Sequence, residues 1–93
     1  MKSLLKMAFS VQFGPQASKF IKKLDSNTKE RIKAKVQRLC NDPFPSETER
    51  VEGYKGEKVF RVRVGDYRIL YIVRYVQSSI IIVSVDKRSR VYG

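Results

Sequence analysis

Three arginines in one short stretch are the residues of this sequence most suited to chemistry. In the stretch Lys58–Tyr75, apolar residues alternate with arginines before Gly65-Asp66, and aromatic and β-branched residues resume after it, a pattern typical of a β-hairpin. If Gly65 takes the positive φ of a two-residue type II′ turn, Arg63 lies opposite Arg68, and Arg61 shares their face. Guanidinium groups on one face bind phosphate and stabilise the spread negative charge of phosphoryl transfer.

The row of arginines on one face has two interpretations. Like charges opposite each other destabilise a sheet by a few tenths of a kcal/mol up to about 1 kcal/mol, and a bound polyanion relieves that repulsion. Alternatively, the arginines are long side chains on the solvated face of an amphipathic sheet.

The end of the chain adds further basic residues and a tyrosine. Ile80 to Val85 is an apolar run typical of a strand covered on both sides, and a turn at Gln77-Ser78 would place Lys87 opposite Arg68. The basic face would then extend into a third strand. The tail after that strand holds Arg88, Arg90 and Tyr92. A tyrosine beside an RNA backbone can stack on an unpaired base or transfer a proton if its pKa is lowered.

Composition limits the partner and the chemistry. The chain has 93 residues, a length that predicts one domain, residues 1–93. Its net charge of +11 predicts an acidic partner: nucleic acid, an anionic membrane surface or an acidic protein. There is no histidine and one cysteine, Cys40, so the usual zinc and haem ligand sets and imidazole-based catalysis are excluded. RNA supplies its own nucleophile, the 2′-hydroxyl, so we expect no cofactor and no metal.

No segment has the apolar length of a membrane span, and Lys6 and Gln12 interrupt any signal-peptide core. We therefore expect a cytoplasmic protein with no membrane partner.

The elements that precede the hairpin follow from periodicity. Apolar residues alternate from Leu5 to Phe13, which predicts a strand with one buried face. Ala17, Phe20, Ile21 and Leu24 then mark a short amphipathic helix after Pro15. A second helix begins in the cluster 25–28, where Asn27 and Glu30 resemble a capping box, and its apolar stripe includes Cys40 as a small core residue. Residues 47–53 are a possible short edge strand.

On the residues alone, a basic sheet that only docks on nucleic acid is the simpler interpretation. A resemblance to a known family favours a catalytic function instead. The element order, KLDSNTKERI, the hairpin FRVRVGDYRILYIV and the closing VDKRSRVY together resemble the RelE/ParE toxin superfamily, on its RelE branch, over essentially the whole chain.

The resemblance implies a two-layer α+β fold, β-α-α-β(3 or 4), with both helices on one face of a curved antiparallel sheet. It implies the toxin of a type II toxin-antitoxin system that cleaves mRNA in the ribosomal A site. In that reaction the 2′-hydroxyl attacks the adjacent phosphate, and a 2′,3′-cyclic end results. The implied partners are the ribosome, mRNA and a RelB-like antitoxin, in a heterodimer or heterotetramer.

The same resemblance assigns roles to individual residues. Arg61 and Arg63 occupy two basic strand positions, Arg68 and Arg88 hold the scissile phosphate, and Tyr92 stacks on or positions the nucleotide. Substrate contacts are expected from Lys58, Lys87 and Arg90. Well-known members have lysines where this chain has Arg61 and Arg63, so the general base is left open among Lys58, Lys87 and Tyr92. Two other functions are weighed: a ParE-like toxin that inhibits DNA gyrase without cleaving RNA, and a non-catalytic RNA-binding domain.

Overall fold

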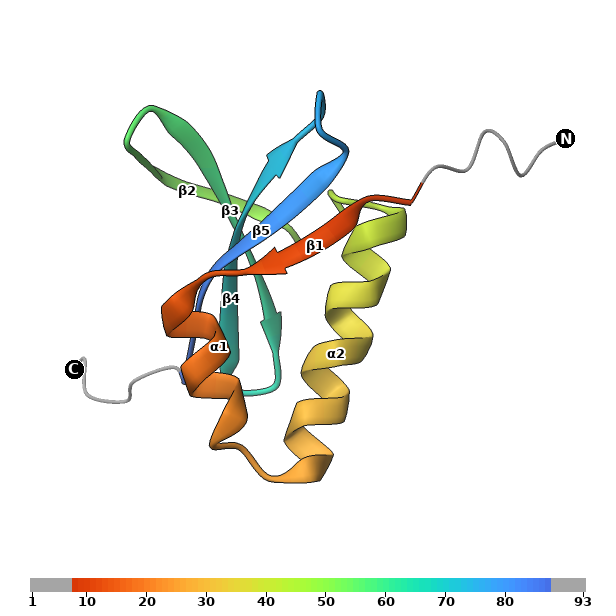
Figure 1. Ribbon diagram of the computed structural model, residues 1–93, viewed down its shortest axis with the longest axis vertical. Helices are drawn as coiled ribbons and strands as arrows, with labels where there is room; N and C mark the ends of the chain where they lie inside the picture. The colour runs from red at the N-terminus through yellow and green to blue at the C-terminus, as the bar shows by residue number, and fades with distance from the viewer. Residues whose placement is uncertain (1–7, 88–93) are drawn as a thin grey trace, which may run out of the picture.

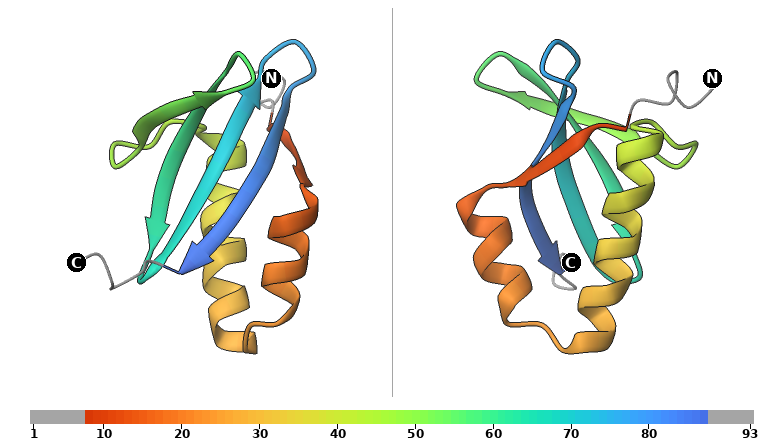
Figure 2. Two further views of the ribbon diagram at one scale, coloured as in Figure 1. Left: turned by 90° about the vertical axis from the view of Figure 1, so that its left-hand side faces the viewer. Right: turned by 45° about the vertical axis from the view of Figure 1, so that its right-hand side comes forward.

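Two helices cover one face of a five-stranded sheet in the computed structural model, which describes residues 8–87 (Figure 1). The chain runs β1 (Ser10–Phe13), α1 (Pro15–Lys22), α2 (Ser26–Asn41), β2 (Glu49–Tyr54), β3 (Glu57–Val64), β4 (Tyr67–Arg74) and β5 (Ser79–Lys87). The sheet order is β1-β5-β4-β3-β2. In Figure 2 both helices lie behind the sheet in one view, so its other face is open. The predicted two-layer α+β fold is confirmed.

The core lies between the helices and the sheet. The inward residues of α2 repeat at helical spacing, and those of the strands alternate, so both patterns place apolar side chains in the same layer. Ile32 and Leu39 of α2 meet Val62, Ile69 and Ile82 of the sheet, and each of these five is at most 1% exposed. The hairpin alternation and the α2 stripe through Ile32 and Leu39 are confirmed, whereas Cys40, predicted as a small core residue, is only partly buried and lies outside the core cluster.

The hairpin has the predicted register. Val64 pairs with Tyr67, Arg63 with Arg68, and Val62 with Ile69. Gly65 has φ 58°, as a type II′ turn requires at its first central residue. Side chains alternate across a strand, so this register places Val62 and Ile69 in the core and the arginines on the open face.

The first strand differs from the prediction in its pairing. β1 runs parallel to β5, with Val11 opposite Ile80, so the sheet is mixed, while β2 to β5 are antiparallel. The helix pair between β1 and the rest of the sheet supplies the crossover that parallel pairing needs. Phe9 and Val11 pack against the core, whereas Phe13, also predicted to face inward, is 41% exposed at the end of β1. Leu5 and Met7 lie outside the described residues.

The second helix begins with a different cap from the one predicted. Asp25 is the N-cap, and its carboxylate accepts hydrogen bonds from the Thr28 backbone N–H at 3.1 Å and the Thr28 hydroxyl at 2.6 Å. The Asn27–Glu30 capping box is therefore wrong, because Asn27 lies already inside the first turn of α2. Residues 49–54 do form the expected edge strand β2.

Candidate functional site

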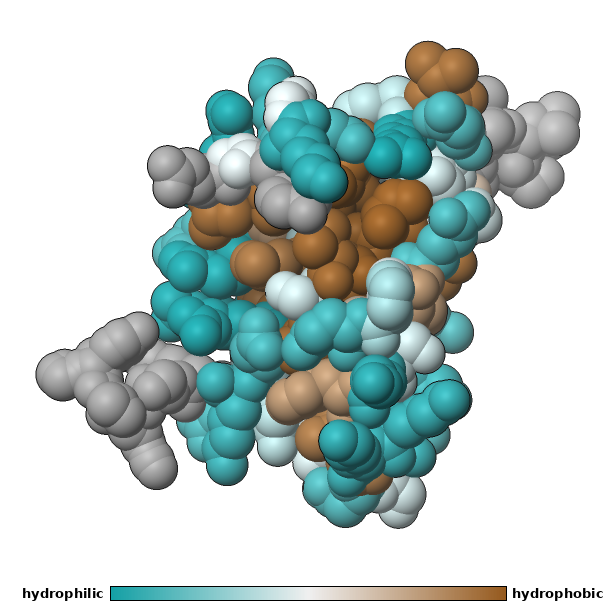
Figure 3. Space-filling model, turned by 60° about the vertical axis from the view of Figure 1, so that its left-hand side comes forward, coloured by the Kyte–Doolittle hydropathy of each residue, from teal (hydrophilic) through white to brown (hydrophobic). Residues whose placement is uncertain are grey.

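The open face of the sheet carries arginines, whereas the face covered by the helices carries the apolar side chains of the core. Arg61 and Arg63 of β3 and Arg68 of β4 share this face, and they are joined there by Glu49 from β2 and Asp86 from β5. We call these five residues the arginine face. It lies toward the β3–β4 turn. In Figure 3, which looks obliquely onto this side of the molecule, hydrophilic side chains border an apolar area in the upper part of the view.

Arg61 is held by a carboxylate from the neighbouring strand. It pairs in register with Glu49, and its Nη2 donates to the Glu49 Oε1 in an ion pair. The hydrogen bond and charge of Arg61, with the nearby charge of Arg63, keep the pKa of Glu49 below its ordinary value. Glu49 is therefore an anion at neutral pH, and it offsets part of the positive charge at the β2 side of the face.

Arg63 and Arg68 have no comparable partner. They stand directly opposite each other in the hairpin register, and within residues 8–87 neither forms an ion pair. Asp86 is the cross-strand partner of Arg68, but its Oδ1 accepts a hydrogen bond from the Gln16 Nε2 at 3.2 Å instead. The guanidinium groups at the turn end of the face are thus not held in ion pairs by carboxylates of the described residues.

Two buried donors on the arginine face also lack acceptors. Among the described residues, the Nε atoms of Arg61 and Arg68 are buried and have no hydrogen-bond partner. Buried polar groups are satisfied in the great majority of cases, so an unsatisfied one calls for a functional or structural reason. Both arginines line a hollow of about 220 Å³ with Val51, Leu70 and Asp86. A second hollow, of about 230 Å³, lies beside it and is lined by Glu47, Glu49, Arg61 and Arg63.

The register of β5 corrects one sequence prediction. Arg74 pairs with Ser79, so the connection is four residues long, with Ser78 at φ 51°, instead of a two-residue turn at Gln77-Ser78. A β-bulge between the pairs Tyr71–Ile82 and Leu70–Ser84 then shifts the register again.

Lys87 consequently lies opposite Tyr67, and the predicted pairing of Lys87 with Arg68 is wrong. The Lys87 ammonium is 6.0 Å from the Tyr67 ring centroid. Asp86, which was not predicted as a site residue, lies opposite Arg68 on the arginine face in the position predicted for Lys87.

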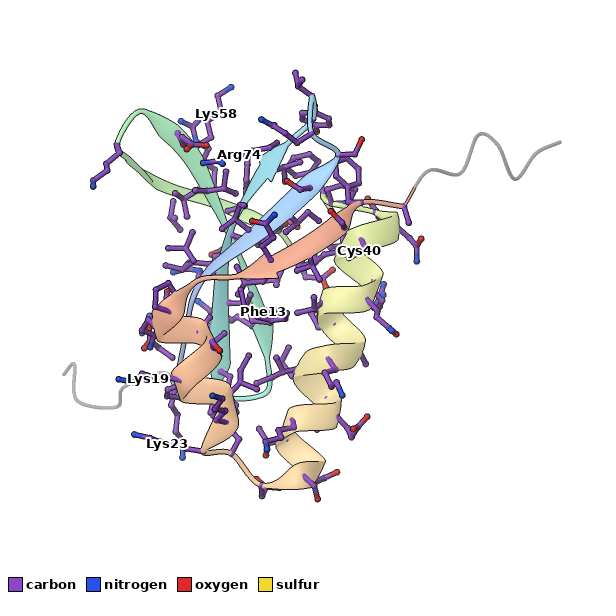
Figure 4. The ribbon with its side chains drawn as sticks, in the orientation of Figure 1. Phe13, Lys19, Lys23, Cys40, Lys58 and Arg74 are labelled. Atoms are coloured by element: carbon purple, nitrogen blue, oxygen red, sulfur yellow. The ribbon has the colours of Figure 1, made fainter. Side chains whose placement is uncertain are left out.

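The remaining predicted site residues fall into two groups. Lys58 lies near the start of β3, and Figure 4 shows it beside Arg74 at the end of the sheet far from Lys19 of α1 and from Lys23, the residue that follows α1. It is thus separated from the arginine face along the strand. Arg88, Arg90 and Tyr92 lie outside the described residues.

One further basic residue missed by the sequence interpretation reaches the hairpin turn. A side-chain carbon added at Gly65 would lie 2.4 Å from Arg31 Nη2, so the Arg31 guanidinium from α2 covers the turn. In the described part of the chain Arg31 has no ion pair. Its position was not readable from sequence because it depends on how α2 crosses the sheet. The positive φ of Gly65 is what favours glycine there, because the Arg31 guanidinium is the far end of a flexible side chain and can move aside.

This fold has counterparts among known proteins. Residues 11–92 match the family model described as "ParE toxin of type II toxin-antitoxin system, parDE". The chain therefore belongs to the RelE/ParE superfamily of type II toxin-antitoxin toxins. RelE1 of Methanocaldococcus jannaschii is 30% identical over 87 residues, which cover 92% of this chain and 97% of that relative.

Solved structures of RelE-type toxins are also similar to this chain. The chain is similar to RelE in the archaeal RelE-RelB complex from Pyrococcus horikoshii, with a TM-score of 0.77, 28% identity and coverage of 90% of this chain and 99% of that one. It is also similar to a chain of the intact Escherichia coli RelBE toxin-antitoxin complex, with a TM-score of 0.71, 25% identity and coverage of 89% and 100%. The RelE-type fold implied by the resemblance is thereby confirmed.

Proposed function

We propose that this protein is a ribosome-dependent mRNA endoribonuclease that cleaves the codon in the ribosomal A site. The observation that carries the proposal is the pair Arg63–Arg68: two arginines directly opposite each other, neither of which forms an ion pair within residues 8–87. Such a pair destabilises the hairpin by itself and is neutralised by a phosphodiester. Membership of the toxin family supports the same substrate.

The reaction needs a nucleophile, charge stabilisation and two proton transfers. The RNA 2′-hydroxyl attacks the adjacent phosphorus, the bond from phosphorus to the 5′-oxygen breaks, and a 2′,3′-cyclic phosphate remains. A base takes the 2′-hydroxyl proton and an acid protonates the departing 5′-oxygen. Arg68, with Arg88 of the tail, holds the non-bridging oxygens, where fixed guanidinium groups stabilise the charge that builds up in the transition state.

The other predicted residues complete this proposal. Arg61 and Arg63 are the two basic strand positions beside the phosphate, Tyr92 stacks on or positions the nucleotide, and Lys87 and Arg90 contact the flanking backbone. Since Lys58 lies at the other end of β3, Lys87 and Tyr92 remain as candidates for the base.

The proposed partners are the ribosome, mRNA and a RelB-like antitoxin. Relatives solved as RelE-RelB complexes support the antitoxin, and the assembly that we propose is a heterodimer or heterotetramer. Since ribosomes are the target, the proposed location is the cytoplasm. The described residues include no helix that is long and apolar enough to cross a membrane.

A test of the proposal is cleavage on purified translating ribosomes. The protein is added to ribosomes stalled with a defined codon in the A site, and the mRNA ends are mapped. We expect a cut within that codon and a cyclic phosphate at the new 3′ end. Stable binding to the ribosome without any new mRNA end would contradict the nuclease function.

A ParE-like gyrase inhibitor is the second candidate, because the matching family model carries the ParE description. It is tested by gyrase supercoiling in the presence of the protein without ribosomes. The arginine face favours the nuclease, since binding a topoisomerase gives no reason to gather phosphate ligands on one face. A protein that neither cleaves mRNA nor inhibits gyrase, but binds RNA, would be the third candidate, a non-catalytic RNA-binding domain.

A further inference from the structure

A group of aromatic rings lies at the end of the sheet away from the hairpin turn. It is formed by the residue before β1, the loop before β2, strands β3 and β4, and the residue after β4, and we call it the aromatic corner: Phe9, Phe44, Phe60, Tyr71 and Tyr75. Figure 4 shows Lys58 and Arg74 at this end of the molecule. The arginine face does not use these rings.

The rings are held in place by one another, and apart from Tyr71, which is fully buried, they are not fully covered. The Phe44 and Phe60 centroids are 4.8 Å apart with planes at 74°, and those of Phe9 and Tyr75 are 5.8 Å apart at 77°. Edge-to-face contacts of this kind are attractive and fix ring orientation. Tyr75 is nevertheless 63% exposed and Phe44 39% exposed. The corner therefore presents ordered aromatic surface to solvent.

A hollow runs beside these rings. It has a volume of about 450 Å³, and its lining includes Phe44, Phe60 and Tyr75 together with Lys58 and Glu57. Ligand sites in proteins commonly measure about 300–1,000 Å³, so this hollow has the size for one planar group and its substituents.

The charge at the hollow favours an anion. Glu57 is neutralised by Arg74, whose Nη2 lies 2.7 Å and whose Nε lies 3.3 Å from its carboxylate oxygens. Lys58 is exposed and forms no ion pair with any residue in the range 8–87. An uncompensated ammonium beside exposed rings is the combination by which proteins bind single-stranded nucleic acid.

We propose that the aromatic corner binds an unpaired nucleotide of RNA, with the base stacked on Tyr75 and Phe44 and the phosphate held by Lys58. Stacking on aromatic faces is tolerant of sequence, and a lysine supplies a point charge for the backbone. The corner is a second RNA contact, because Lys58 and Arg63 are separated by about 16 Å along β3 at the usual strand rise. The choice of RNA over another polyanion rests on the proposed function.

The test uses an RNA that cannot be cleaved. Binding of a single-stranded 2′-O-methyl hexa-adenylate is compared with binding of an abasic chain that carries the same number of phosphates. We expect Tyr75→Leu to weaken binding of the hexa-adenylate about ten-fold and to leave binding of the abasic chain unchanged, since stacking requires a base. Tyr75→Phe keeps the ring and should bind both as the unaltered protein does.

Two controls separate this site from general attraction to a basic protein. Val76→Ser alters the next residue, which is 95% exposed and has no ring, and should leave both affinities unchanged. Lys58→Gln should lower the dependence of binding on salt by about 0.7 in the logarithmic slope, as loss of one phosphate contact to a single strand does, whereas Lys19→Gln should not. Circular dichroism melting confirms that each variant is folded.

The proposal is overturned if Tyr75→Leu and Val76→Ser bind the hexa-adenylate equally, or if Tyr75→Leu weakens both ligands alike. It is also overturned if Tyr75→Leu weakens binding of the antitoxin alone, because the corner would then be a protein-docking surface. The assay contains no ribosome and no cleavable bond, so a protein without nuclease activity can still give the predicted result.

A photoreactive residue at position 76 identifies the source of the nucleotide on the ribosome. A cross-link to mRNA or to ribosomal RNA would each support the site and distinguish the two strands. A cross-link only to ribosomal protein would contradict it.

Discussion

The two faces of the sheet differ in how far the fold itself satisfies their side chains. On the helix-covered face, Val62 and Ile69 are at most 1% exposed and sit in a continuous apolar layer. On the open face of the same two strands, Arg61 and Arg68 each bury an Nε with no acceptor in the described residues. Since the residues of the two faces alternate along one backbone, the hairpin provides stability on one side and unsatisfied donors on the other. We infer from these unsatisfied donors that the open face is arranged for a partner outside the fold.

The largest expected effect comes from the covered face. Ile69→Ala should lower the free energy of unfolding by about 2–5 kcal/mol, because it removes a fully buried side chain and leaves a cavity. Leu70→Ala, at the next residue but on the partly exposed open face, should cost clearly less. Urea unfolding of both variants checks this. Equal losses would mean that the two faces do not differ as described.

Loss of the N-cap of α2, the helix that covers this face, should lower the free energy of unfolding by less. Asp25→Ala removes the acceptor of the Thr28 N–H and hydroxyl bonds, so we expect a loss of about 1 kcal/mol in the free energy of unfolding. Asp25→Asn, which can still accept a hydrogen bond, should recover most of it. An unchanged unfolding midpoint for Asp25→Ala would show that the cap does not help to hold α2 against the sheet.

On the open face, removal of a charge should increase stability. Arg63→Gln relieves the repulsion with Arg68, so the free energy of unfolding should rise by about 0.2–1 kcal/mol. The same variant should bind non-cleavable RNA more weakly. Thermal melting and a binding titration measure the two quantities. A variant that is less stable would show that Arg63 contributes to the fold and would weaken the contrast between the faces.

The smallest expected effect is the pH dependence of the exposed ion pairs. Hydrogen bonds from Lys35, Arg61 and Arg74 lower the pKa values of Glu47, Glu49 and Glu57 from 4.5. The folded pKa values lie below the unfolded ones, so these pairs stabilise the fold above pH 4.5 and lose that contribution as pH falls through the folded values.

Urea unfolding between pH 7 and pH 3 measures this slope, which should be shallow because all three carboxylates are at the surface. Glu49→Gln should reduce the slope further. A variant with an unaltered slope would mean that the Arg61–Glu49 pair is not maintained in solution.

The covered face could be predicted from sequence, and the open face only in part. Alternation around Gly65-Asp66 fixes the hairpin register, because a one-residue slip would turn Val62 and Ile69 away from the core. The parallel pairing of β1 and the position of Asp86 could not be predicted, since they depend on a crossover, a four-residue connection and a β-bulge. Glu49 was missed as well, because β2 has little alternation and its register is set only by pairing with β3.

The most direct test of the central claim compares two arginines on one strand. Arg68 lies on the arginine face without an ion pair in the described chain, whereas Arg74 lies at the other end of β4 and is paired with Glu57. Single-turnover cleavage of A-site mRNA should fall about 10²–10³-fold in Arg68→Ala, as expected for loss of a group that stabilises transition-state charge, and should be nearly unchanged in Arg74→Ala. Equal rates for Arg68→Ala and Arg74→Ala, or normal cleavage by Arg68→Ala, would contradict the assignment of the arginine face as the site of the reaction.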